Sequence, residues 1–359
     1  MSDRPLRTLL TEVMGSGPKT ADDMTYEQAR NAFDHILDGN ADPVTLGGFL
    51  LAARWKVNTP TELAGFLDAL RDRATLSSPE VQPVDCGANY DGKTETAILG
   101  VAAGLVAASA GVPIAVHAGR RLPASHGDTY RNVLEALDVE TSLTPSASAQ
   151  VLDEAGFALY NQSHFLPALD ALRDVRTSMG VRTPLNTVET LVNPANASVH
   201  LGSFFHLSYG ERIARTVAES HSLPVERVVL LQGLEGYDDV RPGRTTMVEW
   251  RCGDEIAERQ LEARKHGIEF DRSTLGVADI AADSAAITES ILAGERDGPI
   301  ADAVVLNAAI RIYAGGATNS IAEALEFARE RLDAGAARER LSILRDAEST
   351  ETVTPRNHP

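Results

Sequence analysis

The first 75 residues place apolar side chains at helical spacing in three segments, and each segment opens with a residue type that caps helices. Thr25 is followed by Gln28 in a capping pattern, and Asp42 and Thr59 each precede a proline that suits the first helical turn. Turn residues separate the segments. This pattern predicts a small helical domain over residues 1–75, with helices at 25–39, 42–56 and 59–74.

Beyond residue 80, short apolar runs alternate with segments of helical spacing. The runs that predict strands are 81–85, 112–117, 157–160, 227–233 and 245–250. From Val277 the pattern is helical up to a polar tail. This alternation predicts an α/β domain over 76–347, with a mostly parallel sheet and C-terminal helices, and a flexible tail over 348–359. The later helices are expected either to flank the sheet or to pack back on the N-terminal domain.

A helical part and an α/β part that meet in this way leave a cleft between them. Ligands of α/β proteins bind in such clefts and at the carboxyl ends of parallel strands. Four segments with polar or glycine residues follow predicted strands or open predicted helices, and they are the candidates for chemistry. They cover 86–96, 116–139, 175–197 and 231–240.

Composition narrows the class of protein. The chain has 359 residues, is 43% hydrophobic and carries a formal net charge of −18. It can therefore build a core, but its acidic surface disfavours broad binding of nucleic acid. No apolar run reaches the roughly 18 residues of a membrane-spanning helix, and the N-terminus has no export signal. A cytoplasmic protein without a membrane partner is expected. Two cysteines make neither a disulfide framework nor a metal cluster.

The segment from Cys86 to Thr96, CGANYDGKTET, connects a predicted strand with a helix rich in small residues. Glycine-rich loops in this position often hold a phosphate, because backbone amides and the helix N-terminus attract anions. Here the glycines are sparse, and they are Gly87 and Gly92. The residues alone leave three interpretations open: a phosphate cradle, an altered cradle or an ordinary turn.

The chain resembles the anthranilate phosphoribosyltransferase family, within the wider glycosyltransferase group that also contains pyrimidine nucleoside phosphorylases. The likeness is carried by RTSMGVRTPLNTVETLVNPANA (176–197), GPIADAVVLNAAIRIYAGG (298–316) and VLEALDV (133–139). The resemblance implies a magnesium-assisted transfer of phosphoribosyl from phosphoribosyl pyrophosphate (PRPP) to anthranilate, in tryptophan biosynthesis. It also implies a homodimer formed through the N-terminal helices.

The motifs that bind the donor depart from the family's pattern. The family's loop reads Gly-Thr-Gly-Gly-Asp-Gly, whereas residues 87–92 here read GANYDG, and the family's Asn-Ile-Ser-Thr aligns with AILG at 97–100. Val116 stands where the family's Lys-His-Gly-Asn-Arg has its lysine. Tyr90 in place of a glycine narrows the space for a pyrophosphate. These changes resemble a divergent branch of the family with YDG and GxEG patterns, of which at least one line is associated with nucleic-acid binding.

The resemblance also implies the residues that touch ligands. Substrate contacts are expected from Gly87, Asn89, Asp91, Gly92, Lys93, Thr94, His117, Arg120, Arg176 and Asn186. Asp238 and Asp239 match the family's Asp-Glu pair, and adjacent carboxylates suit magnesium, with Glu235 close by in the sequence. Arg176 and Arg182 match arginines near the anthranilate carboxylate, which arginine grips in a bidentate pair. No residue is assigned as catalytic.

Three functions compete at this stage. The first is a phosphoribosyltransferase with an altered PRPP loop, which works by positioning and by stabilising the departing diphosphate. The second is a non-catalytic member that binds nucleic acid or another phosphate ligand, against which the net charge of −18 stands. The third, a nucleoside phosphorylase, has no motif in its favour. The retained arginine segment and Asp pair favour the transferase, with a loop partly closed to PRPP.

Overall fold

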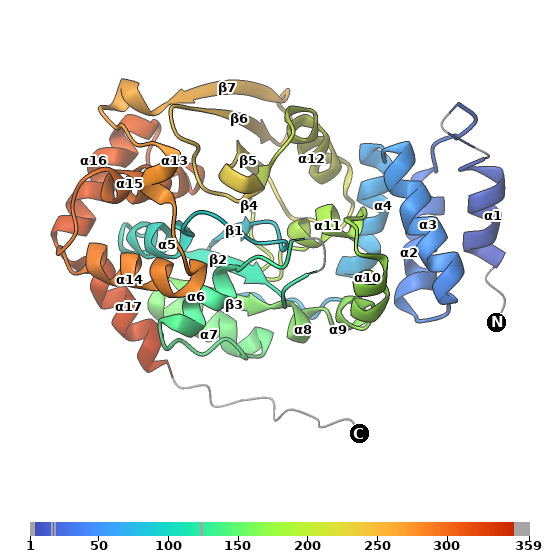
Figure 1. Ribbon diagram of the computed structural model, residues 1–359, viewed down its shortest axis with the longest axis horizontal. Coiled ribbons are helices and arrows are strands. Elements are labelled where there is room, and N and C mark those ends of the chain that lie inside the picture. The colour runs from blue at the N-terminus through green and yellow to red at the C-terminus, as the bar shows by residue number, and fades with distance from the viewer. Residues whose placement is uncertain (1–3, 16, 18, 123–124, 348–359) are drawn as a thin grey trace.

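The computed structural model describes residues 4–15, 17, 19–122 and 125–347, and the predicted flexible tail lies outside these ranges. The N-terminal helices lie together at one end of the molecule (Figure 1). They are α1 (Arg4–Glu12), α2 (Tyr26–Leu37), α3 (Pro43–Lys56) and α4 (Pro60–Arg71). The three predicted helices are confirmed, and the sequence pattern missed α1, which precedes them.

Reciprocal caps fix where α2 and α4 begin. The Gln28 amide donates to Thr25 Oγ1 at 3.2 Å, and the Thr25 amide donates to Gln28 Oε1 at 2.9 Å. Thr59 and Glu62 form the same pair at the start of α4. The Glu62 side chain is fully buried and also accepts from the Met24 amide at 2.8 Å. One carboxylate therefore joins the starts of two helices.

Among the described residues, a seven-stranded sheet forms the centre of the second domain, in the order β3-β2-β1-β4-β5-β6-β7 (Figure 1). Strands β1 to β5 pair in parallel, whereas β6 and β7 run antiparallel. The strands are β1 (Val84–Gly87), β2 (Ile114–Ala118), β3 (Phe157–Asn161), β4 (Val199–Phe204), β5 (Arg227–Gln232), β6 (Arg244–Arg251) and β7 (Ala257–Glu262). The predicted α/β domain with a mostly parallel sheet is confirmed.

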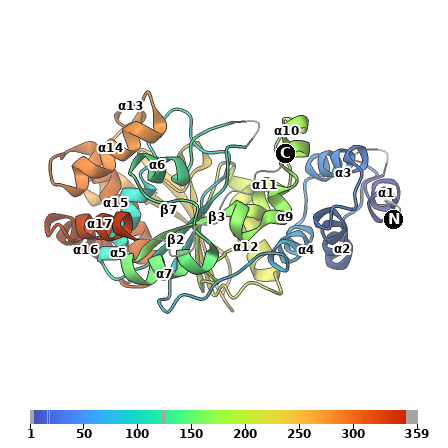
Figure 2. The ribbon, with the colours of Figure 1, turned by 90° about the horizontal axis from the view of Figure 1, so that it is seen from below.

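Helices lie on both sides of this sheet (Figure 2). On one side lie α5 (Gly100–Ser109), α6 (Tyr130–Ala136), α7 (Pro145–Ala155), α13 (Arg272–Leu275), α14 (Ile280–Leu292), α15 (Pro299–Ala314), α16 (Ile321–Asp333) and α17 (Ala336–Asp346). On the side of the N-terminal domain lie α8 (Gln162–Phe165), α9 (Pro167–Asp170), α10 (Arg173–Met179), α11 (Leu185–Val188) and α12 (Leu207–Glu219). The short 3₁₀ helices are η1 (Glu189–Leu191), η2 (Leu234–Gly236) and η3 (Ala263–His266).

The C-terminal helices take the first of the two expected arrangements, and only earlier helices pack back on the N-terminal domain. The C-terminal helices flank the sheet, and α15 packs on α5. Helices α10, α11 and α12 pack back on α3 or α4 of the N-terminal domain. None of the helices in the described ranges is long and apolar enough to cross a membrane.

Helix α5 follows the loop after β1 and approaches its neighbours closely because it consists of small residues. A Cβ atom at Gly100 would lie 2.1 Å from the Tyr130 hydroxyl oxygen, and one at Gly104 would lie 2.5 Å from the ring of Phe157. Neither position accepts a larger side chain without movement. The first turn of α5 is therefore held against α6, and this contact positions the candidate site.

Candidate functional site

A cleft lies between the N-terminal helices and the carboxyl ends of β1 and β4. It encloses a cavity of about 290 Å³. Its lining comes from α3, α4, α11, α12 and the loops after β1, β4 and β5: Arg54, Val57, Asn58, Leu63, Asn89, Asp91, Arg182, Thr183, Pro184, Asn186, Thr187, Thr190, Ser203, Phe204, Phe205, His206, Tyr209, Arg212, Ile213, Glu235 and Gly236. The cleft predicted between the helical part and the α/β part is present.

The loop after β1 is held by close backbone packing. A Cβ atom at Gly87 would lie 1.9 Å from the Thr190 carbonyl oxygen, and Gly92 has a φ of 75° beside the backbone of Asp128. Asn89 accepts from the Gly92 amide at 3.1 Å through its side-chain oxygen. The two glycines that remain in the loop are therefore required by its own packing.

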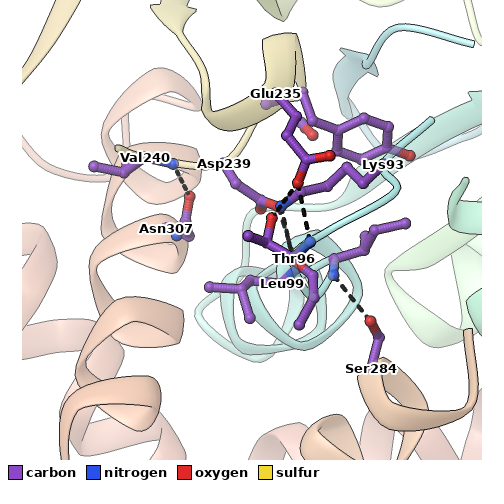
Figure 3. A network of polar contacts seen from close by, with 12 residues as sticks. Lys93, Thr96, Leu99, Glu235, Asp239, Val240, Ser284 and Asn307 are labelled. Carbon is purple, nitrogen blue, oxygen red and sulfur yellow. Dashed lines mark hydrogen bonds and ion pairs between the residues drawn. The ribbon is translucent and has the colours of Figure 1, made fainter. Parts of the chain in front are cut away.

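Backbone amides of residues 94–96, at the end of this loop, form an anion cradle, and the carboxylate of Glu235 occupies it (Figure 3). Glu235 Oε2 accepts from the amides of Thr94 at 2.9 Å and Glu95 at 3.2 Å. Glu235 Oε1 accepts from Thr96, from its amide at 3.0 Å and from its hydroxyl at 2.6 Å. Burial alone would raise the pKa of Glu235, but these hydrogen bonds and Lys93 lower it below the usual value.

Lys93 extends from the same loop into the interior. Its side chain is fully buried, and Nζ lies 2.7 Å from Asp239 Oδ2 and 2.7 Å from the Ala97 carbonyl oxygen. Asp239 Oδ2 also accepts from the Leu99 amide, at 3.3 Å, just before the first residue of α5. Figure 3 shows Lys93, Asp239 and Leu99 converging on this point. The ammonium group and the helix N-terminus thus share one carboxylate.

The neighbouring carboxylate, Asp238, belongs to a separate buried group. Both of its carboxylate oxygens accept from the Tyr130 hydroxyl at 2.6 Å, and Oδ2 also accepts from Arg311 Nη2 at 2.8 Å. All three side chains are fully buried. Burial raises the pKa of Asp238 above its ordinary value, although Arg311 opposes the shift. The group joins α6, α15 and the loop after β5.

Asp238 and Asp239, as placed here, do not fit a magnesium ion. Magnesium takes few carboxylates and keeps several waters, so the oxygens that bind it must be accessible. Both side chains are fully buried, and each already pairs with a cationic side chain. Asp239 Oδ1 is buried without a hydrogen-bond partner, but one oxygen is not a ligand set. Over the described ranges, no group of three or more His, Cys, Asp or Glu side chains could hold a metal ion.

The side chains of Tyr90, in the loop, and His117, in β2, are buried and do not line the cavity. Tyr90 is 1% exposed, and its hydroxyl oxygen lies 2.5 Å from Nδ1 of His117, which is equally buried. Burial raises the pKa of Tyr90 well above its ordinary value. On its other side, His117 Nε2 lies 3.4 Å from Asp85 Oδ1. These contacts place His117 in the core, where it supports the loop.

The arginines of the predicted anthranilate segment divide between the core and the cleft. Arg176 is buried and forms a bidentate pair with Glu189, with both N–O distances at 2.8 Å. Arg182 lines the cavity, and its Nε lies 2.8 Å from Asp91 Oδ2. Asn186 also lines the cavity and donates to Asp91 Oδ1 at 3.3 Å. Arg182 is therefore the better placed of the two arginines for a ligand.

The remaining predicted contacts are spread around the cleft. Asn89 and Asp91 line the cavity, and Asn89 donates to the Gly236 carbonyl oxygen at 2.7 Å. Thr94 and Arg120 are exposed and lie outside the cavity lining. The cavity thus gathers Asn89, Asp91 and Asn186 of the predicted set, and leaves Lys93, His117 and Arg176 in the interior.

Several cavity residues were not predicted. Arg54 comes from the end of α3, and a cluster with aromatic and basic side chains opens α12: Phe205, His206, Tyr209 and Arg212. The guanidinium carbon of Arg212 lies 4.8 Å from the Tyr209 ring centroid. Their sequence, FHLSYGER, directly follows β4. A run of aromatic and basic residues after a strand would have indicated a binding site. The sequence pattern did not predict β4, so this run was not recognised.

Two family models match the chain. The model described as the helical bundle domain of a glycosyl transferase family matches residues 12–74, and the one described as the a/b domain matches residues 85–338. Among curated proteins, the anthranilate phosphoribosyltransferase of Thermomicrobium roseum is 34% identical over 330 residues, which cover 90% of this chain and 92% of that protein.

Solved structures agree with these matches. The crystal structure of anthranilate phosphoribosyltransferase from Thermus thermophilus has a TM-score of 0.80 at 28% identity, and the match covers 96% of this chain and 98% of that chain. The Saccharomyces cerevisiae enzyme, solved in complex with PRPP and Mg, has a TM-score of 0.80 at 19% identity, with the same coverage. The predicted resemblance and the predicted class, an anthranilate phosphoribosyltransferase-like glycosyltransferase, are confirmed.

Proposed function

The chain belongs to the glycosyl transferase family, and from this premise we propose that it transfers a pentosyl group from a phosphorylated donor to an aromatic amine that carries a carboxylate. The observation that carries the proposal is the cavity of about 290 Å³, which the loop after β1 and three arginines share. The loop offers Asn89 and Asp91 on one side. The arginines, which come from α3, α12 and the segment before α11, offer positive charge on the other.

The arginine side of the cleft suits the acceptor. Arg54, Arg182 and Arg212 line the cavity together with the aromatic side chains of Phe205 and Tyr209. Arginine binds a carboxylate through charge-assisted hydrogen bonds, and aromatic rings supply apolar contact for an aromatic body. An aromatic carboxylate such as anthranilate meets both requirements.

The loop side of the cleft suits a pentose. In the transfer, the bond between the pentose C1 and the phosphate oxygen breaks, and the phosphate leaves with the electron pair. A bond forms between C1 and the amine nitrogen, whose proton passes to solvent. Asn89 and Asp91 supply polar groups at the carboxyl end of β1, where a sugar would be held in position for this step.

One observation favours the alternative, a member of the family that binds without transfer. The amides of Thr94 and Thr96 and the two aspartates after β5 already have partners among other residues of this chain. A binding protein for another phosphate ligand or for nucleic acid needs no metal site. The net charge of −18 makes nucleic acid the weaker of these ligands.

Calorimetry with anthranilate, followed by a product assay, tests the proposed function. Anthranilate should bind the wild-type protein, and Arg182→Ala should weaken binding by tenfold or more, because a hydrogen bond to a charged group contributes roughly 1.5–3 kcal/mol. Arg215→Ala is the matched control, since Arg215 pairs with Glu211 on α12 and lies outside the cavity lining. The product assay supplies PRPP or ribose 1-phosphate as donor.

The outcomes separate the two functions. A product that joins pentose and anthranilate, formed from either donor, supports the transferase. Binding of anthranilate or of a phosphate ligand without any product from either donor would support the binding protein. No binding of anthranilate at millimolar concentration, together with no product, would remove the transferase proposal.

We further infer a cytoplasmic homodimer in tryptophan biosynthesis, from the same family membership.

A further inference from the structure

The anion cradle of the loop is filled from within the chain. Three consecutive amides, those of Thr94, Glu95 and Thr96, point at one carboxylate, and the hydroxyls of Thr94 and Thr96 add two more donors. Donors arranged in this way bind phosphate oxygens in loops between a strand and a helix. Here the acceptor is Glu235, which lies 141 positions beyond Thr94 in the sequence.

The position beside the cradle where a cation would bind is also occupied by a side chain of this protein. Magnesium commonly joins a substrate phosphate to one or two protein carboxylates, and here a carboxylate after β5 faces the start of α5. The carboxylate at this point is Asp239, and the cation is the ammonium group of Lys93, at 2.7 Å and fully buried. Lys93 Nζ also donates to the Ala97 carbonyl oxygen, so its position is fixed from two sides.

We propose that Glu235 and Lys93 close this loop to magnesium diphosphates. The Glu235 carboxylate occupies the amides that would bind a phosphate, and the Lys93 ammonium group occupies the position beside Asp239 that a metal ion would take. The proposal rests on the proposed function only for the location of the ligand cleft. It specifies which ligands the cleft can take. They are anions that bind without a divalent metal and without hydrogen bonds from the loop amides.

Both occupants are held by their surroundings. Glu235 has a φ of 56°, and the carbonyl oxygen of the next residue, Gly236, accepts from Asn89 at 2.7 Å and from Ser203 at 2.8 Å. The backbone of Lys93 pairs with that of Asp128 through two hydrogen bonds, of 2.9 and 3.0 Å. The backbone that carries each side chain is therefore fixed by hydrogen bonds made outside the cradle.

The first residue of α5, which follows the loop, is also tightly packed. A Cβ atom at Gly100, the first residue of α5, would overlap the Tyr130 hydroxyl, at 2.1 Å. Tyr130 is engaged by Asp238 and Arg311, so it cannot turn aside without breaking a buried group. The start of α5 is therefore packed against α6, and the cationic side chains that line the cavity are Arg54, Arg182 and Arg212.

Calorimetry with inorganic pyrophosphate and with PRPP, each with magnesium or with a chelator, tests the closure. The wild-type protein should show no magnesium-dependent binding of either ligand. Glu235→Ala empties the cradle and should bind pyrophosphate at least tenfold more tightly than the wild type. Glu95→Gln is the matched control, because Glu95 lies on the same loop but its exposed side chain pairs with Arg272. It should behave like the wild type.

A second measurement addresses Lys93. Lys93→Ser leaves Asp239 without its cation, so magnesium chloride should raise the melting temperature of this variant and leave that of the wild type unchanged. Where Lys93→Ser does not fold, the Glu235 measurements decide. Tight, magnesium-dependent binding of PRPP to the wild type would overturn the proposal, as would pyrophosphate binding to folded Glu235→Ala that is no stronger than to the wild type.

The closure and the proposed function fail separately. The proposed function would be refuted by the absence of both anthranilate binding and product. That result would not affect the interpretation of the pyrophosphate measurements. Conversely, PRPP binding to the wild type would reject the closure while supporting the transferase.

Discussion

Asp85 lies between two histidines in the centre of the sheet. Its Oδ2 is 2.7 Å from His200 Nδ1, and its Oδ1 is 3.4 Å from His117 Nε2. Burial alone would raise the pKa of Asp85, but His117 and His200 outweigh it and lower the pKa to about 2. Because His117 also contacts Tyr90, this cluster supports the loop after β1 from below.

The lowered pKa predicts acid sensitivity with a defined sign. The pKa of Asp85 in the folded state lies below its unfolded value, so its stabilising contribution is present above about pH 4 and is lost as pH falls toward about 2. The loss is on the order of 2 kcal/mol, since a tenfold change in proton affinity corresponds to about 1.4 kcal/mol. Urea unfolding of the wild type and Asp85→Asn across this range measures it.

The difference in unfolding free energy between the two proteins should shrink as the pH falls. A constant difference across the range would contradict the prediction. If Asp85→Asn does not fold, carboxyl carbon NMR of the wild type measures the pKa directly, and a value near 4 would contradict it equally.

Residue identity predicted the chemistry of the cleft only in part. Lys93 was expected beside a substrate anion, and it is instead the partner of Asp239, 146 positions away in the sequence. Arg176 was expected at the acceptor carboxylate, and it pairs with Glu189 in the interior. Position in a motif indicates which residues come near the cleft, but the partner that neutralises a buried charge is fixed by tertiary packing. Arg182, which the motif also contains, does line the cavity.

Elements with strong end signals were predicted best. α2, α3 and α4 begin next to Thr25, Asp42 and Thr59, whose side chains cap them in the structure. β4 and β7 were not predicted, because neither strand consists of a continuous run of apolar residues. In β4, His200 is buried only because Asp85 pairs with it, and a single sequence does not show that pairing. β7 forms an edge of the sheet and is largely exposed, so it carries charged residues.

The cap of α4 gives a prediction at the scale of one element. Thr59→Ala removes the hydroxyl that accepts from the Glu62 amide at 3.2 Å. The free energy of unfolding should fall by about 1 kcal/mol, the usual cost of losing such a cap. Ser342→Ala is the control, since Ser342 is exposed within α17 and should leave stability almost unchanged. Denaturant unfolding that shows equal stability for wild type and Thr59→Ala would contradict the prediction.

At the scale of the whole molecule, the sequence predicted two parts and a cleft between them, and it left open where the later helices lie. The alternation of strands and helices is local, so it identified the α/β domain. Whether a helix flanks the sheet or the N-terminal domain depends on contacts between distant segments, such as α12 with α4 and α15 with α5. These contacts place the aromatic and basic cluster of α12 opposite α3, which completes the cleft.

The N-terminal helices present an apolar face that predicts a homodimer. On α3, Val44, Leu51 and Trp55 are 84%, 47% and 72% exposed, and their spacing of seven and four residues places them along one side of the helix. Leu51 and Trp55 also line a shallow groove between α1 and α3, together with Leu10. A monomer would leave this apolar surface in water, and burying it between two copies is favourable.

Sedimentation at micromolar concentration should therefore show a dimer, and the double variant Leu51→Glu, Trp55→Glu should sediment as a monomer with unchanged helix content. The two new carboxylates would be buried side by side without partners, which costs more than the contact gains. Ile343→Glu is the control: Ile343 is an exposed apolar residue of α17, at the opposite end of the molecule from α3 (Figure 1). It should leave the dimer intact. A monomeric wild type would contradict the prediction, and dissociation by Ile343→Glu alone would move the interface to α17.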